Sequence, residues 1–389
     1  MSHQSFRELG VSAPVVDALA ARSIHEPFPI QALALPDALA GLDVLAKSPT
    51  GSGKTLAFAL PIVQRTATTD ARPSALVLVP TRELAAQVTA ELESLAPSMG
   101  LSVASVYGGV PLRAQASRAK SAHILVATPG RLEDLAERRL VDLTHVRILV
   151  LDEADRMLDM GFQPQVDRIV RRVPRNRQTM FFSATLDGRV GELARAYTNS
   201  PSRFETQPST EEPGEIDHRF VSVTAKTKVD TLIEQIRSSE GLTLVFTRTK
   251  RGADRLAQKL GRQNVPAVAM HGDMSQNARE RALARFESGK VKTLVATDVA
   301  ARGLDLDDVT QVINFDPPEE DKDYVHRTGR TGRAGRDGTA VTLVLPEQQA
   351  ETSRVARRLG HGERFEQAGL KSAPSKLLYT SRNRRRSRW

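Results

Sequence analysis

Residues 149–155, with the sequence LVLDEAD, constrain the fold more than any other stretch of the chain. An apolar run of strand length ends there in three carboxylates within four residues, Asp152, Glu153 and Asp155. A continuous apolar run indicates a parallel strand buried on both faces, and α/β sheets bind ligands at the carboxyl ends of such strands. Clustered carboxylates favour a bound cation, and Mg²⁺ fits one or two of them. The alternative interpretation is an acidic helix N-terminus, which the helix dipole favours by itself.

A second motif, in residues 43–63, favours the metal site. A short strand at 43–46 is followed by the turn SPTGSGKT at 48–55 and by an apolar helical run through Val63. Backbone N–H groups in such a turn cradle phosphate oxygens, Lys54 adds a positive charge, and the Thr55 hydroxyl suits Mg²⁺. Ser48 stands where the usual phosphate-loop pattern has its first glycine. The predicted phosphate-binding residues are Thr50, Gly51, Ser52, Gly53, Lys54 and Thr55.

The two motifs complement each other chemically. We expect Thr55 and Asp152 to hold the same Mg²⁺, directly or through water. Glu153 is then free to polarise a water for attack on a γ-phosphorus, which makes it the candidate catalytic base.

Further apolar runs at 75–79, 103–106 and 124–127 each end in polar or turn residues. Successive parallel strands would present these loops along one edge of the sheet. Glycines, hydroxyls and arginines there suit a sugar-phosphate backbone, because such donors position it without reading bases. The alternative for each loop taken singly is an ordinary turn. The candidate backbone-binding residues are Pro80, Thr81, Arg82, Gly108, Gly109, Thr128, Pro129, Gly130 and Arg131.

A sixth run, at 180–182, leads into Ser183-Ala184-Thr185, whose hydroxyls are placed to bridge the acidic cluster to what lies beyond it. Residues 199–217 hold three prolines and five acids without an apolar period, which is typical of a linker. A second alternation of strands and helices follows, with strand-like runs at 242–246, 267–270, 293–296, 311–315 and 340–345.

This pattern predicts an α/β fold of two parallel-sheet domains with a cleft between them. We expect a first domain at 1–204, a linker at 205–217, a second domain at 218–369 and a short disordered basic tail at 370–389. The tail holds two lysines, five arginines and no acid, so the rest of the chain carries only +2 of the total charge of +9. An RNA tether and a solubilising terminus are both compatible with such a tail.

The second domain has no phosphate loop of its own, but residues 326–336, HRTGRTGRAGR, separate arginines by glycines. Arginines at this spacing suit a polyphosphate, because they can stabilise the charge that spreads over it in the transition state. An arginine finger accelerates hydrolysis about 10³- to 10⁵-fold. A basic loop that binds nucleic acid is the alternative.

Composition excludes several classes of protein. The chain has no cysteine, which rules out disulfides and thiolate metal sites, and its eight histidines lack metal-ligand spacing. The start has no apolar signal-peptide region, and no run approaches the length of a membrane span, so we expect a soluble, cytoplasmic protein.

Taken together, the motifs resemble those of the DEAD-box ATP-dependent RNA helicases, and the match runs from Phe6 to about Arg336. Residues 29–31 with upstream Phe6 resemble the Q motif, 50–55 motif I, 152–155 motif II and 183–185 motif III. Residues 245–248 resemble motif IV, Gln276 with Arg279 a Q-x-x-R pattern, 297–305 motif V and 326–333 motif VI. The usual Gly-aromatic pair of the Q motif is replaced by Ser23-Ile24, and Ser48-Pro49 precede the phosphate loop.

The resemblance implies two RecA-like domains that bind ATP, Mg²⁺ and single-stranded or structured RNA, with closure of the cleft driving local unwinding. It assigns ATP binding to Phe6, Gln31 and Asp305, with the Gln31 amide at the adenine edge. It assigns the γ-phosphate to Arg330 and Arg333, coupling between domains to Asp155, Ser183, Thr185 and His326, and RNA contact also to Thr247, Arg279 and Thr297. An RNP or a ribosomal precursor is compatible as a target, and the sequence does not select one.

The sequence also has features of three other functions. Residues 227–230, TKVD, fit a guanine-reading pattern of GTPases, but they open an apolar helix instead of closing a strand. An RNA clamp or chaperone that unwinds little remains open, as does a DNA helicase of the same superfamily.

Overall fold

The computed structural model describes residues 4–48, 52–206, 214–301, 306, 308–332 and 335–372. Compact packing divides the chain into two units, with unit 1 made mainly of residues up to Pro213 and unit 2 mainly of residues from Gly214 onward. The basic tail predicted at 370–389 lies outside the described residues from position 373 onward.

Unit 1 alternates strands and helices. Its elements are α1 (Ala13–Ala20), α2 (Pro29–Ala40), β1 (Val44–Lys47), α3 (Lys54–Arg65), β2 (Ala75–Leu78), α4 (Arg82–Leu95), the 3-10 turn η1 (Ala96–Met99), β3 (Val103–Val106), α5 (Leu112–Ser121), β4 (Ile124–Ala127), α6 (Pro129–Glu137), β5 (Ile148–Leu151), α7 (Ala154–Asp159), α8 (Gln163–Val170), β6 (Gln178–Ser183), α9 (Gly188–Tyr197) and β7 (Ser202–Glu205).

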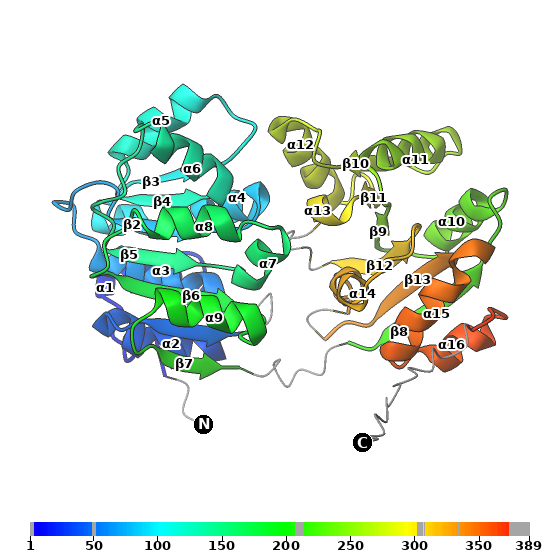
Figure 1. The fold of residues 1–389 in the computed structure, drawn as a ribbon, viewed down its shortest axis with the longest axis horizontal. Helices are drawn as coiled ribbons and strands as arrows, with labels where there is room; N and C mark the ends of the chain where they lie inside the picture. Colours follow the sequence, from blue (N-terminus) through cyan, green and yellow to red (C-terminus); the bar gives the residue numbers. More distant parts are fainter. Residues whose placement is uncertain are drawn as a thin grey trace, which may run out of the picture. The chain divides into compact units, whose positions relative to one another are not determined.

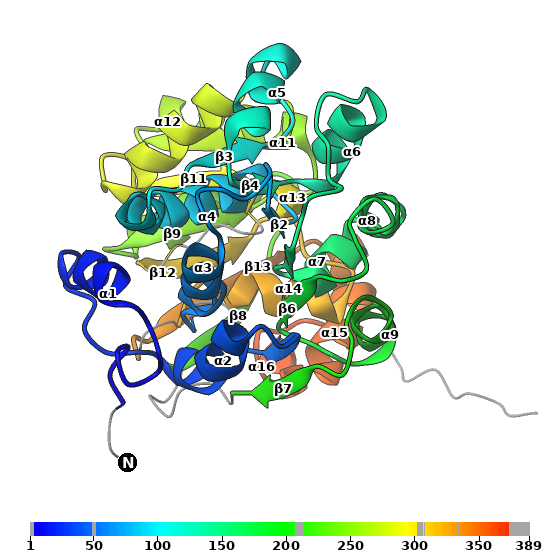
Figure 2. The ribbon, with the colours of Figure 1, turned by 90° about the vertical axis from the view of Figure 1, so that its left-hand side faces the viewer.

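The strands of unit 1 form one parallel sheet in the order β3-β4-β2-β5-β6-β1-β7 (Figure 1). Alternate residues of each strand face opposite sides, so Val77 and Val150 join one core while Leu76 and Leu149 join the other. Helices α1 to α4 cover the first face and α5 to α9 cover the second (Figure 2). Burial on both faces is why the strands read as continuous apolar runs.

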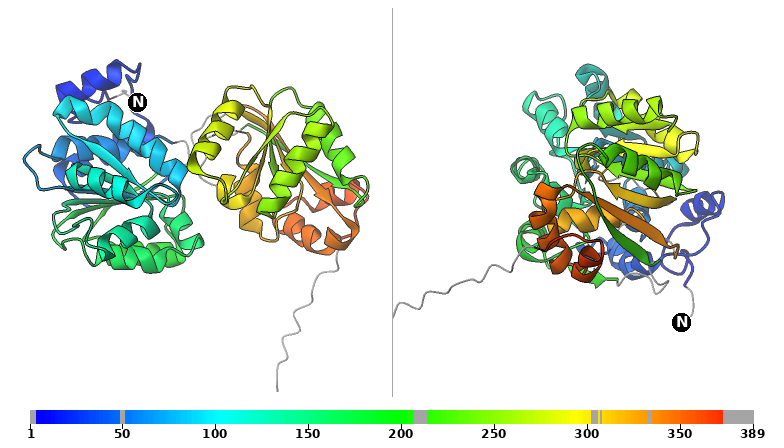
Figure 3. Two further views of the ribbon diagram at one scale, coloured as in Figure 1. Left: turned by 90° about the horizontal axis from the view of Figure 1, so that it is seen from above. Right: turned by 90° about the vertical axis from the view of Figure 1, so that its right-hand side faces the viewer.

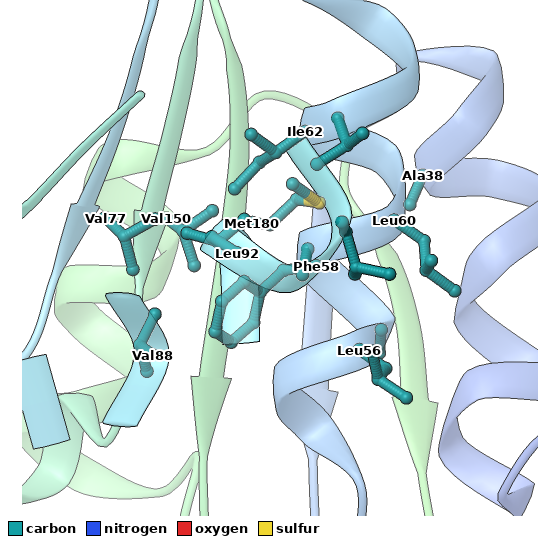
Figure 4. Close-up of a cluster of buried hydrophobic side chains, with 14 of the residues drawn as sticks. Ala38, Leu56, Phe58, Leu60, Ile62, Val77, Val88, Leu92, Val150 and Met180 are labelled. Carbon is teal, nitrogen blue, oxygen red and sulfur yellow. The ribbon is translucent and has the colours of Figure 1, made fainter. Parts of the chain in front are cut away.

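Helix α3 fixes the place of the turn that precedes it. Its apolar residues 56–60, 62 and 63 are buried, and Phe58 packs edge-on against Phe182 of β6 with ring centroids 5.3 Å apart. Figure 4 shows Phe58 and Ile62 of α3 with Val77, Val150 and Met180 of the sheet. The helix therefore holds its own N-terminus firmly above the end of β1.

Unit 2 has the same architecture. Its elements are β8 (Ile216–Ser222), α10 (Lys228–Arg237), β9 (Leu242–Phe246), α11 (Lys250–Arg262), β10 (Ala267–Met270), α12 (Gln276–Glu287), β11 (Thr293–Ala296), α13 (Asp298–Ala301), β12 (Val309–Asn314), α14 (Asp321–Thr328), β13 (Gly338–Val344), the 3-10 turn η2 (Pro346–Gln348), α15 (Gln349–Arg358) and α16 (Gly362–Gln367).

The strands of unit 2 are parallel in the order β10-β11-β9-β12-β13-β8. Helices α10 and α11 pack on one face with Val245, Ile313 and Val341. Helices α14 to α16 pack with β8 and the end of β13 around Tyr324 and Phe365. Figure 3 shows the yellow-green α10 and α11 and the orange-to-red α15 and α16 on different sides of the sheet.

The predicted α/β fold with two parallel sheets is confirmed, and the differences are local. The segment 199–217, predicted as a linker, contains strand residues near both ends, because β7 (from Ser202) pairs with β1 and β8 (from Ile216) pairs with β13. Both strands lie at sheet edges, where β7 alternates half-buried with exposed residues and β8 buries only Phe220, so they lack the continuous apolar run that marks a central strand.

The helical interpretation of 227–230 is confirmed, because α10 begins at Lys228. The Lys228 ammonium is bonded to Asp316 at 2.9 Å and lies over the Phe315 ring, so it is a packing residue of unit 2. In the part of the chain that the structure describes, no helix is long and apolar enough to cross a membrane.

Candidate functional site

The phosphate loop connects the end of β1 to the start of α3. Gly53 precedes α3 with φ +81°, and a Cβ there would lie 2.5 Å from Gln31 Nε2 and 2.7 Å from Phe28 Cδ2, so glycine is required. Lys54 is buried and its Nζ donates to the Ser48 carbonyl at 2.9 Å. Thr50 and Gly51 lie outside the described residues, and Ser52 bonds the Ser48 hydroxyl. The loop therefore gathers an ammonium and a helix N-terminus at one sheet edge, as a phosphate site needs.

The two residues that the resemblance assigns to the base are both buried. Gln31 is fully buried; its Oε1 accepts from the Phe28 N–H at 3.0 Å, and its Nε2 donates to the Gly53 carbonyl at 2.8 Å. Phe6 is 2% exposed and belongs to the core of unit 1. Gln31 thus joins the start of α2 to the phosphate loop, and the contact of either residue with a base stays a prediction.

The acidic cluster lies where β5 ends. Asp152 is 3% exposed, and burial raises its pKa to about 7, with the nearby Lys54 charge opposing that rise and Glu153 adding to it. Glu153 adopts a left-handed backbone conformation, φ +50° and ψ +49°, immediately before α7. Such a conformation costs a non-glycine residue about 1–3 kcal/mol, so the surrounding structure holds it in place.

Glu153 forms an ion pair that the sequence analysis missed. Its Oε2 accepts from Arg156 Nη1 at 2.7 Å, and both side chains are nearly buried, at 12% and 10% exposed. The i, i+3 spacing on α7 was available in the sequence as a signal. Arg156 is therefore the residue that orients the candidate base.

Ser183 connects the phosphate loop to the acidic cluster. It ends β6, which lies between β1 and β5 in the sheet. Its carbonyl accepts from the Ser48 N–H at 3.0 Å, and its hydroxyl accepts from the Asp155 N–H at 3.3 Å. The Thr185 hydroxyl donates a long hydrogen bond to Asp155 Oδ2 at 3.4 Å. The structure thus brings the predicted residues of the phosphate loop, the acidic cluster and the hydroxyl pair together.

The residues present fit Mg²⁺. Among the described residues there is no group of three or more metal-ligating side chains, and Mg²⁺ characteristically takes one or two carboxylates and completes its shell with waters and substrate phosphates. Asp152 is such a carboxylate, desolvated in a site where a cation would offset its burial. Thr55, in the first turn of α3, supplies the hydroxyl.

A second group of predicted residues lies at the carboxyl ends of β2, β3 and β4, which are neighbours in the sheet. The Arg82 guanidinium lies against the turn after β3, since a Cβ on Gly108 or Gly109 would come within 3.0 and 2.4 Å of it. Arg131 donates to the Val110 carbonyl and to Gln115 Oε1, both at 2.8 Å. The two arginines therefore stabilise the loops at this edge of the sheet and also make the edge positively charged.

The other residues of this edge differ in exposure. Thr81 caps α4 by accepting from the Leu84 N–H, and Pro80, Thr128 and Pro129 are buried. Gly130 is exposed, with nothing within 4 Å of where a Cβ would stand. The accessible part of the edge is therefore made of arginines and glycine backbone, as contact with a sugar-phosphate chain requires.

Unit 2 places its predicted residues along the corresponding edge of its own sheet. Thr247 follows β9 and Thr297 follows β11, both buried, and Arg279 is buried on α12. His326 lies in the last turn of α14, and its carbonyl accepts from Arg330 Nε at 3.4 Å. Asp305 and Arg333 lie outside the described residues.

Arg327 has a different role from its neighbours in the arginine-glycine segment. It is 5% exposed and makes two bonds to Asp298, at 2.6 and 2.7 Å. It also donates to Asn314 Oδ1 at 3.1 Å and to the Asp316 carbonyl at 2.7 Å, with Phe246 stacked 5.0 Å away. Arg327 is thus a structural residue of unit 2, and nothing in the sequence separates it from the arginines beside it.

Comparison with known proteins agrees with this geometry. Residues 28–193 match the family model of the DEAD/DEAH box helicases, and residues 227–335 match the helicase conserved C-terminal domain. The chain is 43% identical over 345 residues to the DEAD-box ATP-dependent RNA helicase CshA of Streptococcus pneumoniae, covering 88% of this chain and 66% of that one. It is 41% identical over 356 residues to CshA of Geobacillus kaustophilus, covering 91% of this chain and 76% of that one. The chain belongs to the DEAD-box helicase family.

Solved structures of DEAD-box proteins share the fold. Saccharomyces cerevisiae Dbp5 bound to RNA and ADP BeF3 matches with a TM-score of 0.80 at 30% identity, covering 95% of each chain. A DEAD box protein from Methanococcus jannaschii matches with a TM-score of 0.52 at 34% identity, covering 95% of this chain and 99% of that one. The family resemblance predicted from the motifs is confirmed.

Proposed function

We propose that the protein is an RNA-dependent ATPase that acts as an ATP-dependent RNA helicase. The observation that carries the proposal is the connected site in unit 1, where Ser183 bonds both the phosphate loop and the acidic cluster. Relatives named as ATP-dependent RNA helicases, and a neighbour bound to RNA and ADP BeF3, support it.

For hydrolysis, we propose that Lys54 and the N-terminus of α3 bind the β- and γ-phosphates, while Thr55 and Asp152 hold Mg²⁺. Mg²⁺ bound to these two residues would supply positive charge to offset the charge that develops on the phosphate oxygens. Glu153, held by Arg156 at 2.7 Å, accepts a proton from the attacking water. Phosphate binding at this loop would present the γ-phosphorus to a base that Arg156 has already oriented.

The arginines of unit 2 complete the proposed site. Arg330 and Arg333 would reach the γ-phosphate when unit 2 closes on unit 1, and Asp305 would contact the ribose. Asp155, Thr185 and His326 would carry the coupling between the units. Because these groups belong to different units, we expect slow hydrolysis until ATP and RNA are both bound.

RNA would bind along the two sheet edges. In unit 1 the accessible groups are Arg82, Arg131 and the backbone of Gly109 and Gly130, none of which reads a base. We propose that closure bends one RNA strand and disrupts a short duplex locally, without sequence preference. An RNP or a ribosomal precursor as the target, a linker within residues 205–217 and a cytoplasmic location stay predictions from the sequence.

The test is steady-state ATP hydrolysis with Mg²⁺, in the absence of nucleic acid and with single-stranded RNA or DNA. We expect stimulation by RNA, and Glu153→Gln should abolish turnover while keeping ATP and RNA binding. Glu93→Gln, the same change at an exposed position of α4, is the matched control and should leave turnover unchanged.

Equal stimulation by DNA, or stimulation by neither nucleic acid, would refute the assignment of RNA dependence. Normal turnover in Glu153→Gln would instead remove Glu153 from the role of base. Strand displacement that occurs without ATP would favour an RNA chaperone.

A further inference from the structure

One aromatic side chain beside the phosphate loop is left more than half exposed in the fold of unit 1. Among the described residues, the large apolar side chains that are strongly exposed are Phe28, Leu33, Leu42, Val299 and Val325. Phe28 is the aromatic one, at 54% exposed. Its ring lies against Gly53, because a Cβ added to that glycine would meet Phe28 Cδ2 at 2.7 Å and Cγ at 3.1 Å.

The backbone of Phe28 is held in place. Its N–H donates to Gln31 Oε1 at 3.0 Å, and the same amide donates to the Gly53 carbonyl at 2.8 Å. Prolines on both sides restrict the chain further, since proline fixes its own φ and limits the residue before it. The ring is therefore presented beside the phosphate loop at a small entropic cost of binding.

Other apolar side chains of this region are not accessible in the same way. Phe6 is 2% exposed and belongs to the core. Ile24 stands where the family has an aromatic residue, and it is partly buried against the same core. Ser23, which replaces the family glycine, adopts φ +60°, so the turn keeps its shape without the aromatic side chain.

We propose that Phe28 binds the nucleobase of ATP by stacking and so supplies the aromatic contact that Ile24 does not. The proposal rests on the proposed function, because it takes ATP as the nucleotide at the loop. A base joined through ribose to a phosphate at Gly53 and Lys54 lies within reach of a ring packed on Gly53. Stacking on a partly exposed ring covers apolar surface that the fold leaves in water.

The test compares substitutions at position 28 by ADP titration calorimetry and by ATPase kinetics of the full chain. Phe28→Ala should weaken ADP binding about ten- to hundredfold, the range of base-aromatic stacking. Phe28→Leu, which keeps an apolar side chain of similar bulk, should weaken it about three- to tenfold, and Phe28→Tyr should stay within about twofold. We expect KM for ATP to rise with kcat retained. Leu33→Ala, at an exposed position of the same helix, is the control and should change neither.

A spectroscopic variant reads the contact directly. The chain has one tryptophan, Trp389, so Phe28→Trp combined with Trp389→Phe places a single fluorophore at the site. Its emission should be quenched by ADP if a base stacks on it.

Several outcomes overturn the proposal. Restoration of ADP affinity by Phe28→Leu would mean that the ring only supports the phosphate loop. Unchanged affinity in Phe28→Ala, or unquenched emission with ADP bound, would mean that the base lies elsewhere. Failure of the proposed function is separate, because it appears as wild-type turnover that RNA does not stimulate.

Discussion

Arg327 and Arg358 offer a direct test of what burial does to an ion pair. Arg327 donates from Nε and Nη2 to Asp298 at 2.6 and 2.7 Å, and Arg358 donates from the same two atoms to Asp321 at the same two distances. The side chain of Arg327 is 5% exposed, whereas that of Arg358 is 53% exposed. The two arginines therefore differ mainly in their surroundings.

We predict that Arg327→Ala destabilises unit 2 by about 3–5 kcal/mol, the cost of breaking a buried pair by removing one partner. Asp298 is 26% exposed, which moves the expectation towards the lower figure. The side-chain oxygen Oδ1 of Asn314, which is fully buried, also loses its arginine donor. An unsatisfied buried acceptor costs about 1–3 kcal/mol, which is part of the predicted total. Arg358→Ala should cost less than about 1 kcal/mol, as exposed pairs do.

Native-state hydrogen exchange suits this comparison, because a chain of two units does not unfold in one step. The slowest amides of β9 and β12 report on unit 2, and those of β5 serve as the internal reference in unit 1. The predicted 3–5 kcal/mol corresponds to exchange about 10² to 4 × 10³ times faster in unit 2, against less than about fivefold for Arg358→Ala.

Equal effects of the two substitutions would refute the argument from burial. Acceleration in β5 as large as in β12 would show that the Arg327 network does not act within unit 2 alone. The measurement needs no nucleotide, so it separates the structural role of Arg327 from the catalytic role proposed for Arg330.

Two further predictions concern groups inside single units. Arg156→Gln should lower kcat about ten- to hundredfold with little change in RNA affinity, because Glu153 loses the partner 2.7 Å away that orients it; an unchanged kcat in steady-state ATPase assays would contradict this. In unit 2, burial and the stacked His361 lower the pKa of His218 to about 4, so between pH 6.5 and 4 the unfolded chain binds a proton that the fold excludes. Unit 2 should lose about 1–2 kcal/mol as the pH falls through that window, a figure reduced for the partial exposure of the ring. His218→Phe should reduce the pH dependence of hydrogen exchange in β8, and the part that remains comes from His361, whose pKa is also lowered by burial and by Arg364.

The sequence was sufficient to predict the central strands of both sheets, because parallel strands that are buried on both faces form continuous apolar runs. The runs at 103–106, 124–127, 242–246, 267–270 and 293–296 are strands with those limits. The edge strands β7 and β8 escaped prediction because charged residues interrupt them, whereas the edge strands β3 and β10 keep short runs of mostly apolar residues. Glycine and lysine marked the phosphate loop, because glycine allows the backbone turn and lysine supplies positive charge. The acidic residues after a strand marked the cation site, because a cation requires negative charge.

What the sequence could not give is how each side chain is used. Motif order assigned Gln31 and Phe6 to the base, yet both are buried in unit 1. The left-handed conformation of Glu153 and its pairing with Arg156 depend on how β5 meets α7. Arg327 and Arg330 lie in one basic segment, and only packing separates the structural arginine from the catalytic candidate.

Ser183 gives the site a geometric constraint. One residue at the end of β6 bonds Ser48 through its carbonyl and Asp155 through its hydroxyl, so a displacement of that strand end changes the positions of both nucleotide-binding segments together. The phosphate loop and the acidic cluster are therefore coupled through one residue of β6, so that a shift of either segment is passed to the other.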